Sequence, residues 1–320
     1  NTWQAYNFYD RDGDGWGDPS GGVTGSISTP TAGASFAATV NLVDRYMNLS
    51  PAGARPLVYT NTNDQYDIDP ATTALIGGTL PVNVTLVSKS TTAVIRVNPQ
   101  DSVPDQVCTA NGPSNVCLAQ APAAVSVPFR VFAAPALRLQ VTLPGETQKP
   151  GKCDFLPGVV CRTLAPAEGL PGKDGAPSDY IVTSPAMTAD VWLVDQFYNP
   201  VSDIAVGPNQ DTNPPAVMPT VRVNFPFDLA AGIPPSAALI LGNRQFNFTP
   251  LTTATDYTVV AATTAASAST WVEAQSTPMR VHPGASHHMH WSGLPGTITA
   301  GTAFSGTLTI HDQFSNVLST

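Results

Sequence analysis

The chain has 320 residues, which is enough for two to three ordinary domains that each bury a core of their own. Its formal net charge is -9, and its 14 Lys and Arg residues form no patch. This argues against a nucleic-acid partner, because such binding depends on basic side chains that neutralise phosphates. Only 12% of the residues are charged, and 31 Pro and 25 Gly interrupt short apolar runs. The composition is typical of all-β extracellular proteins rather than of cytosolic enzymes.

No stretch of the sequence approaches the roughly 20 apolar residues that a membrane-spanning helix needs, so we expect no membrane span here. Residues 1–30 lack the basic start and the apolar centre of a signal peptide. We therefore expect any secretion signal or anchor to lie outside this sequence.

The first predicted site is the loop YDRDGDGWGDPSGG, which begins at Tyr9. It offers oxygen atoms at loop positions one, three, five, seven and nine, with a glycine at six for the sharp turn, which is the ligand spacing of a calcium loop. Position twelve is Gly21 rather than Glu, and no amphipathic helix flanks the loop, so it is not an EF-hand. It resembles instead the calcium loops of thrombospondin type 3 and dockerin-like sequences, with an acidic solvated turn as the alternative. The expected calcium ligands are Asp10, Asp12, Asp14, the Trp16 carbonyl and Asp18.

One strand recurs three times, as FAATVNLVDRYMN from Phe36, MTADVWLVDQFYN from Met187 and FSGTLTIHDQFSN from Phe304. Apolar residues alternate in each copy, which predicts a strand with one buried face. We expect the Asp and Asn that end each strand to hold a turn by accepting hydrogen bonds from loop amides. A catalytic carboxylate would need a partner, and none recurs with it. These turn residues are Asp44 and Asn48, Asp195 and Asn199, and Asp312 and Asn316.

Further strands extend this repeat. Opening strands are predicted from Ala136 and Ser286, closing strands from Val127 and Thr277, and two strands each in the segments that begin at Gly77 and Gly242. The predicted fold is all-β, with tandem immunoglobulin-like β-sandwich domains that carry long loop insertions. The predicted domains are residues 1–133, which lack the first strand, a complete domain at 134–283, and the first strands of a third at 284–320.

The four cysteines form two close pairs, Cys108 with Cys117 and Cys153 with Cys161, each within a loop. Three pairings are possible, and the short separations favour local disulfides, whereas zinc would need hooks of the CxxC kind. Disulfides imply an oxidising compartment outside the cytoplasm, while four reduced thiols are the alternative. The second pair lies in an insertion that runs from Gln148 to about Ser178.

The segments TAGASF from Thr31 and TAGTAF from Thr299, together with the three strand ends, carry a family resemblance. They resemble the filamin and invasin-like immunoglobulin repeats of large bacterial and archaeal surface proteins. Met47, Tyr198 and Ser315 stand where that family usually has Gly. The resemblance implies the architecture and a surface location, without naming a ligand.

The five histidines are candidates for metal ligands, since four of them cluster in the sequence: His282, His287, His288, His290 and His311. On a strand, His288 and His290 would share one face, but two ligands do not make a zinc site, so an exposed edge strand or a domain junction is favoured. No nucleophile elbow, HExxH motif or phosphate-binding glycine loop is present, and no catalytic residue is predicted.

The sequence therefore favours a non-enzymatic structural segment of a secreted cell-surface or filament-forming protein, such as a stalk, sheath, surface layer or adhesin. Its expected partners are copies of itself or neighbouring repeats, and strands of one subunit could complete a sandwich in the next. The alternative is an accessory module of a larger secreted protein or enzyme that binds carbohydrate or another ligand. A glycan would then contact exposed aromatics such as Trp3, Tyr6 and Trp16.

Overall fold

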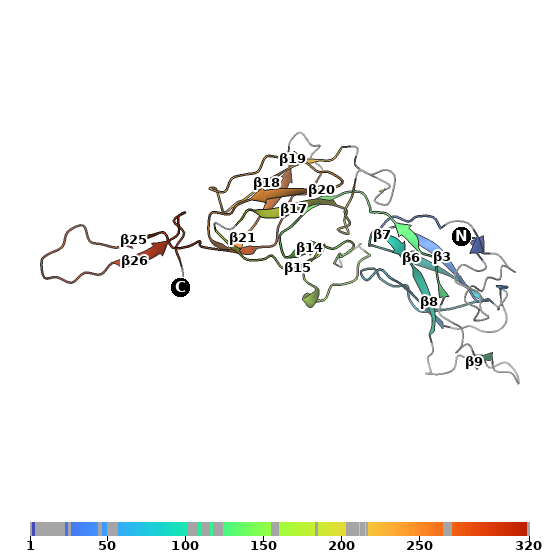
Figure 1. Ribbon diagram of the computed structural model, residues 1–320. Coiled ribbons are helices and arrows are strands. Elements are labelled where there is room, and N and C mark those ends of the chain that lie inside the picture. The colour runs from blue at the N-terminus through green and yellow to red at the C-terminus, as the bar shows by residue number, and fades with distance from the viewer. Residues whose placement is uncertain are drawn as a thin grey trace.

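The computed structural model describes residues 2–3, 23–24, 27–43, 47–49, 57–100, 108–109, 116–117, 124–154, 160–182, 185–202, 211, 215, 217–264 and 271–318. These residues form β-strands and one short 3-10 helix, Pro166–Glu168 (η1), which confirms the predicted all-β class. The chain is elongated, with its first strands at one end and a two-stranded ribbon at the other (Figure 1). No helix among the described residues is long and apolar enough to cross a membrane.

The N-terminal unit, as we call strands β3 to β12, contains a four-stranded sheet in the order β11-β8-β4-β5 and the pairs β3-β6 and β12-β7. Two further pairs, β1-β2 and β9-β10, lie in the same half of the chain. The strands are β1 (Thr2–Trp3), β2 (Val23–Thr24), β3 (Ser35–Asn41), β4 (Leu57–Thr62), β5 (Thr73–Ala74), β6 (Thr79–Thr85), β7 (Ser90–Ala93), β8 (Ile95–Gln100), β9 (Cys108–Thr109), β10 (Val116–Cys117), β11 (Ala124–Val125) and β12 (Phe129–Val131).

The central unit, strands β13 to β24, repeats this arrangement. Its sheets have the orders β19-β18-β22-β23, β13-β17-β20 and β16-β24-β21, and β14 pairs with β15. The strands are β13 (Arg138–Thr142), β14 (Glu146–Gln148), β15 (Lys173–Gly175), β16 (Tyr180–Ile181), β17 (Met187–Val194), β18 (Thr220–Asn224), β19 (Ala237–Ala238), β20 (Asn243–Phe248), β21 (Ala254–Tyr257), β22 (Val260–Thr263), β23 (Ala274–Gln275) and β24 (Met279–His282).

The two units share one order of strand pairing. Strands β3 and β6 correspond to β17 and β20, the sheet β5-β4-β8-β11 corresponds to β19-β18-β22-β23, and the pair β7-β12 corresponds to β21-β24. Both β7-β12 and β21-β24 also contain a register shift. The internal repeat seen in the sequence is therefore a repeat of topology as well.

Three strands, not the predicted two, follow Gly77 and Gly242. In the central unit, β21 pairs with β24, whereas β22 pairs with β18 in a different sheet. The chain passes between the sheets at Thr258–Val259, so one apolar run supplies two strands. The sequence prediction was wrong here because the run contains no Gly or Pro to mark the break.

Each unit has its own apolar core. The predicted alternation along β17 is confirmed, since Met187, Ala189, Val191 and Leu193 are all buried. Their counterparts along β3 pack against the N-terminal core but are only partly buried.

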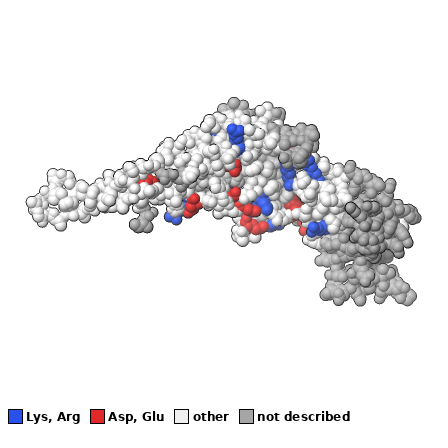
Figure 2. Space-filling view, in the orientation of Figure 1, with Lys and Arg blue, Asp and Glu red and all other residues white. Residues whose placement is uncertain are grey.

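The C-terminal ribbon consists of β25 (His288–Ser292) and β26 (Thr307–His311), which pair antiparallel. One face of the ribbon carries apolar side chains, and these are exposed: Met289, Trp291, Leu308 and Ile310. On the face of the molecule drawn in Figure 2, charged side chains are scattered and form no large patch of either sign.

Candidate functional site

The turn after β17 is organised by Asp195, whose side chain is fully buried. One carboxylate oxygen accepts hydrogen bonds from the backbone amides of Phe197 (2.8 Å) and Asn199 (2.9 Å). The other accepts from the backbone amide of Ala134 (2.8 Å) and from the Asn199 side chain (2.9 Å). The Asp195 carboxylate thus accepts hydrogen bonds from amides of its own turn and also ties the turn to the segment that joins the two units.

The turn after β26 has the same design. Asp312 accepts from the backbone amides of Phe314 and Asn316, each at 2.9 Å. Its second oxygen accepts from the backbone amide of Gly284 (3.0 Å) and from the Asn316 side chain (2.8 Å). Gly284 precedes β25 as Ala134 precedes β13, so the two turns are equivalent contact by contact.

The residue before each asparagine lies in the left-handed region of backbone conformation. The φ angles are 62° at Met47, 65° at Tyr198 and 69° at Ser315. The immunoglobulin-like repeats that the sequence resembles usually have Gly at these three positions. Gly adopts positive φ without steric cost. The departure from the family pattern therefore changes the residue and keeps the backbone conformation.

Asn199 reaches into the N-terminal unit. Its side-chain nitrogen donates to the Val87 carbonyl oxygen (2.8 Å), and its side-chain oxygen accepts from the Lys89 backbone amide (2.7 Å). Asn199 therefore bonds at once to its own turn and to the loop between β6 and β7. We call Asp195, Asn199 and the Val87–Lys89 loop the first clasp.

Asn316 makes the corresponding contacts with the central unit. Its side-chain nitrogen donates to the Leu251 carbonyl oxygen (2.8 Å), and its side-chain oxygen accepts from the Thr253 backbone amide (3.0 Å). We call Asp312, Asn316 and the Leu251–Thr253 loop the second clasp. It joins the C-terminal ribbon to the loop between β20 and β21.

A second aspartate holds each clasped loop from within its own unit. Asp64 accepts from the backbone amides of Val87 and Ser88, each at 2.7 Å, and from the Ser88 hydroxyl at 2.6 Å. Asp228 does the same for the later loop, accepting from the backbone amides of Leu251 (2.6 Å) and Thr252 (3.1 Å). Each loop is thus preorganised before the next unit's asparagine bonds to it.

The pKa values of the two turn aspartates shift in opposite directions, although neither residue is exposed to solvent. Burial raises the pKa of Asp195 to about 6, although the hydrogen bonds from Asn199, Ala134 and Phe197 oppose the rise. Burial also acts to raise the pKa of Asp312, but there the hydrogen bonds from its turn and from Gly284 outweigh it, and the pKa is lowered.

The first junction has an ion pair that the second does not share. The Lys89 ammonium lies 2.9 Å from a carboxylate oxygen of Asp211, whose side chain is almost fully buried. Asp211 also accepts from the backbone amides of Ser202 (2.8 Å) and Ala133 (3.3 Å). At the second junction Thr253 takes the place of Lys89, and threonine has no ammonium group.

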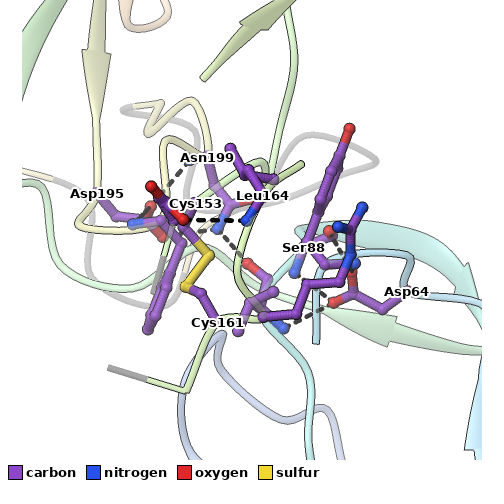
Figure 3. Close-up of a disulfide and its surroundings, with 12 residues drawn as sticks. Asp64, Ser88, Cys153, Cys161, Leu164, Asp195 and Asn199 are labelled. Carbon is purple, nitrogen blue, oxygen red and sulfur yellow. Dashed lines mark hydrogen bonds between the residues drawn. A yellow bond between two sulfur atoms is a disulfide. The ribbon is translucent and has the colours of Figure 1, made fainter. Parts of the chain in front are cut away.

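The insertion of the central unit packs against the N-terminal unit. The structure contains the predicted Cys153–Cys161 disulfide, and both sulfur-bearing residues are buried in the N-terminal core. Arg162 follows the disulfide, donating its backbone amide to the Tyr66 carbonyl oxygen (3.1 Å), with its guanidinium 5.4 Å from the Tyr66 ring centre. Figure 3 shows the disulfide near Asp195 and Asn199 and close to Asp64 and Ser88. The insertion thus acts as a strut across the first junction.

Two buried lysines hold the strut on the central unit. The Lys152 ammonium donates to the Lys173 carbonyl oxygen (2.7 Å) and to Asp174 (2.6 Å). The Lys173 ammonium lies 3.0 Å from Glu146, which in turn accepts from the Thr277 hydroxyl (2.5 Å) near β24. Sequence reasoning missed these residues, since single lysines in a loop give no signal of their partners.

A cavity of about 190 Å³ lies at the same junction, lined in part by Tyr66, Ser88, Lys89 and Lys149. Both lysines are already paired, Lys89 with Asp211 at 2.9 Å and Lys149 with Asp174 at 3.4 Å. The cavity therefore offers no uncommitted ammonium group to a ligand.

Several predicted site residues lie outside the described residues, namely Asp10, Asp12, Asp14, Trp16 and Asp18 of the calcium loop and Asp44 of the first turn. Asn48 is described, and Val43 and Leu49 form a bridge like those that close the other two turns. Cys117 lies opposite Cys108 in the β9-β10 register, and the side chains of these two cysteines are outside the described part. The calcium ligands and the Cys108–Cys117 disulfide stay predictions.

No protein-family model and no curated protein matches the chain. Among solved structures, the chain is similar to one described as the structure of Yersinia pseudotuberculosis InvD, with 14% sequence identity. The match covers 91% of this chain and 69% of that chain, with a TM-score of 0.25. A similarity this low says nothing about function.

Proposed function

We propose that this chain is a non-enzymatic structural segment of a secreted or cell-surface protein, in which immunoglobulin-like sandwiches are fixed end to end. The observation that carries the proposal is the pair of equivalent clasps. Each of them bonds the turn of a later unit to a preorganised loop of the earlier one, through Asn199 and Asn316.

The clasps are suited to fix the angle between neighbouring units as well as to connect them. Every polar atom of the Asp195 and Asn199 side chains that points into the first junction has a hydrogen-bond partner at 2.7–2.9 Å. Opening that junction exposes these groups to water. It also separates the part of the strut that carries the Cys153–Cys161 disulfide from the N-terminal core. A fixed angle between units is what a stalk, sheath or surface layer requires.

The extracellular location is supported by the Cys153–Cys161 disulfide and by the sparse charge of the chain. We propose further that calcium orders the acidic loop of Asp10, Asp12, Asp14 and Asp18. Removal of calcium with a chelator is expected to increase proteolysis within residues 1–25. Unchanged cleavage there would contradict the calcium site and leave the proposed structural role untouched.

Small-angle scattering of the purified chain tests the structural role. The profile should fit one elongated shape with a narrow distribution of angles between the units. Substitution of both clasp asparagines, Asn199→Ala and Asn316→Ala, should broaden that distribution, whereas Asn247→Ala, which changes an exposed asparagine on β20, should not. A compact particle, or a broad distribution in the unsubstituted chain, would overturn the proposal.

A further inference from the structure

The C-terminal ribbon gathers four of the chain's five histidines. The register of β25 and β26 places His288 directly opposite His311 and His290 opposite Thr309. Side chains alternate along a strand, so His288, His290 and His311 share the face of the ribbon opposite to its apolar side chains. The sequence alone showed two histidines on this face, and the strand pairing adds the third.

The spacing of the rings suits a single metal ion. Ring centres are 5.3 Å apart for His288 and His311, 6.0 Å for His290 and His311, and 5.5 Å for His287 and His288. The Nδ1 atoms of His287 and His288 are 3.3 Å apart. Bonds of about 2.0–2.1 Å in a tetrahedral zinc site place ligating nitrogens about 3.3 Å apart and ring centres about 5 Å apart.

His311 is held in the tautomer that a ligand needs. Its Nδ1 lies 2.9 Å from the Ser315 carbonyl oxygen, which can only accept, so Nδ1 carries the proton. The Nε2 atom of the neutral ring then carries the electron pair. It lies 2.7 Å from the Thr309 hydroxyl, which also lies 3.3 Å from the His290 carbonyl oxygen. A ring nitrogen that donates to a backbone carbonyl while the other faces the metal is the usual outer-shell arrangement of metal-binding histidines.

We infer that this face of the ribbon binds one transition-metal ion, Zn²⁺ or a similar borderline cation, through His311 Nε2, His288 and His290, with His287 or water as the fourth ligand. An all-imidazole ligand set suits Zn²⁺, Cu²⁺ and Ni²⁺ and does not suit Ca²⁺. The site adjoins the second clasp, because His311 precedes Asp312 and contacts the Ser315 carbonyl oxygen, and it goes beyond the proposed structural role.

Binding requires the rings to move. Among the residues that the structure describes, no group of three or more His, Cys, Asp or Glu side chains is placed to hold a metal ion with the side chains as they stand. His287, His288 and His290 are exposed and His311 is half-buried, so their rings can turn about the side-chain bonds without disturbing a core. The bound ion would link β25 to β26 on the face opposite to the exposed apolar side chains.

Isothermal titration of the chain with ZnCl₂, with excess Ca²⁺ present to occupy acidic loops, tests the inference. One zinc ion per chain is expected. Loss of an outer-shell partner alone weakens metal binding by about 10- to 100-fold, so His311→Gln and, separately, His288→Gln should weaken it at least that much. His282→Gln is the matched control, since His282 lies outside the ribbon, 2.9 Å from Asp179.

Co²⁺ provides a second readout, since a tetrahedral site gives strong visible absorption that both ribbon variants should lose. Circular dichroism establishes that the variants remain folded. Absence of zinc binding in the unsubstituted chain would overturn the inference, as would equal binding by the chain and the two ribbon variants.

Discussion

Replacing Asn199 with Ala isolates the contribution of the first clasp. The substitution leaves the Lys89 amide and the Val87 carbonyl oxygen, at present 2.7 and 2.8 Å from the Asn199 side chain, without partners while the junction stays closed. A buried polar group without a partner costs about 1–3 kcal/mol, and the part-exposed Lys89 lies at the low end of that range. We expect the closed junction to lose about 2–3 kcal/mol of stability relative to the open one.

Amide hydrogen exchange at Lys89 reports the loss of this bond, because the Lys89 amide donates to the Asn199 side chain in the closed junction. At 1.4 kcal/mol per factor of ten, exchange at Lys89 should accelerate by about 30- to 150-fold. Exchange along β17 should change little, because those amides are protected by strand pairing within the central unit.

Asn316→Ala is the reciprocal control. It should accelerate exchange at Thr253, whose amide bonds to Asn316 at 3.0 Å, and leave Lys89 unchanged. The exposed Asn247→Ala should affect neither amide. The reasoning is refuted if Asn199→Ala leaves Lys89 protected, or if it accelerates Thr253 as much as Lys89.

Three further predictions concern the remaining contacts. Gly33 and Gly301 both have φ near +80°, but a Cβ on Gly33 would lie 2.3 Å from the Phe197 ring, whereas one on Gly301 meets nothing within 4 Å. In denaturant unfolding, backbone strain should lower the free energy of unfolding of both Ala variants by about 1–2 kcal/mol. The clash with Phe197 should lower that of Gly33→Ala by about 1–3 kcal/mol more. Equal losses in the two variants would contradict the contact between Gly33 and Phe197. Cys153→Ser with Cys161→Ser should cost about 2–3 kcal/mol and speed proteolysis near Arg162, and an unchanged melting temperature would argue against the strut. Burial raises the pKa of Asp67 to about 7, the Thr62 hydroxyl opposes the rise, and the Asp64 and Asp69 carboxylates add to it. Since the folded-state pKa exceeds the ordinary value of 3.8, the folded chain holds more protons than the unfolded chain over this range, and the free energy of unfolding should fall as pH rises from about 4 to 7. The Asp67→Asn variant should show a flatter dependence of the free energy of unfolding on pH. An identical dependence in the variant would exclude Asp67 as its source.

The sequence was sufficient for whatever depends on alternation and local spacing. The buried face of β17, the turns at Asp195 and Asp312 and the Cys153–Cys161 disulfide all involve residues close in the chain, where period and loop length leave few alternatives. The recurring asparagine was also visible, and its role within the turn was expected.

The partners across the junctions could not be predicted from one sequence. Asn199 and Val87 are 112 residues apart, and nothing in either segment indicates the other. The same holds for Asp211, which sequence reasoning passed over and which bonds to Lys89 across 122 residues. His311 was considered with the other histidines as a metal ligand, but only strand register places it opposite His288.

The direction of the clasps has a consequence for the order in which the chain folds. Each clasp takes its loop from an earlier segment and its asparagine from a later one, and Asp64 or Asp228 holds the loop from within the earlier unit. A chain that leaves a ribosome or a secretion channel N-terminus first can therefore form each loop before it releases the turn that binds to that loop. We expect the units to lock in sequence from the N-terminus, with no later unit having to wait for a partner that has yet to appear.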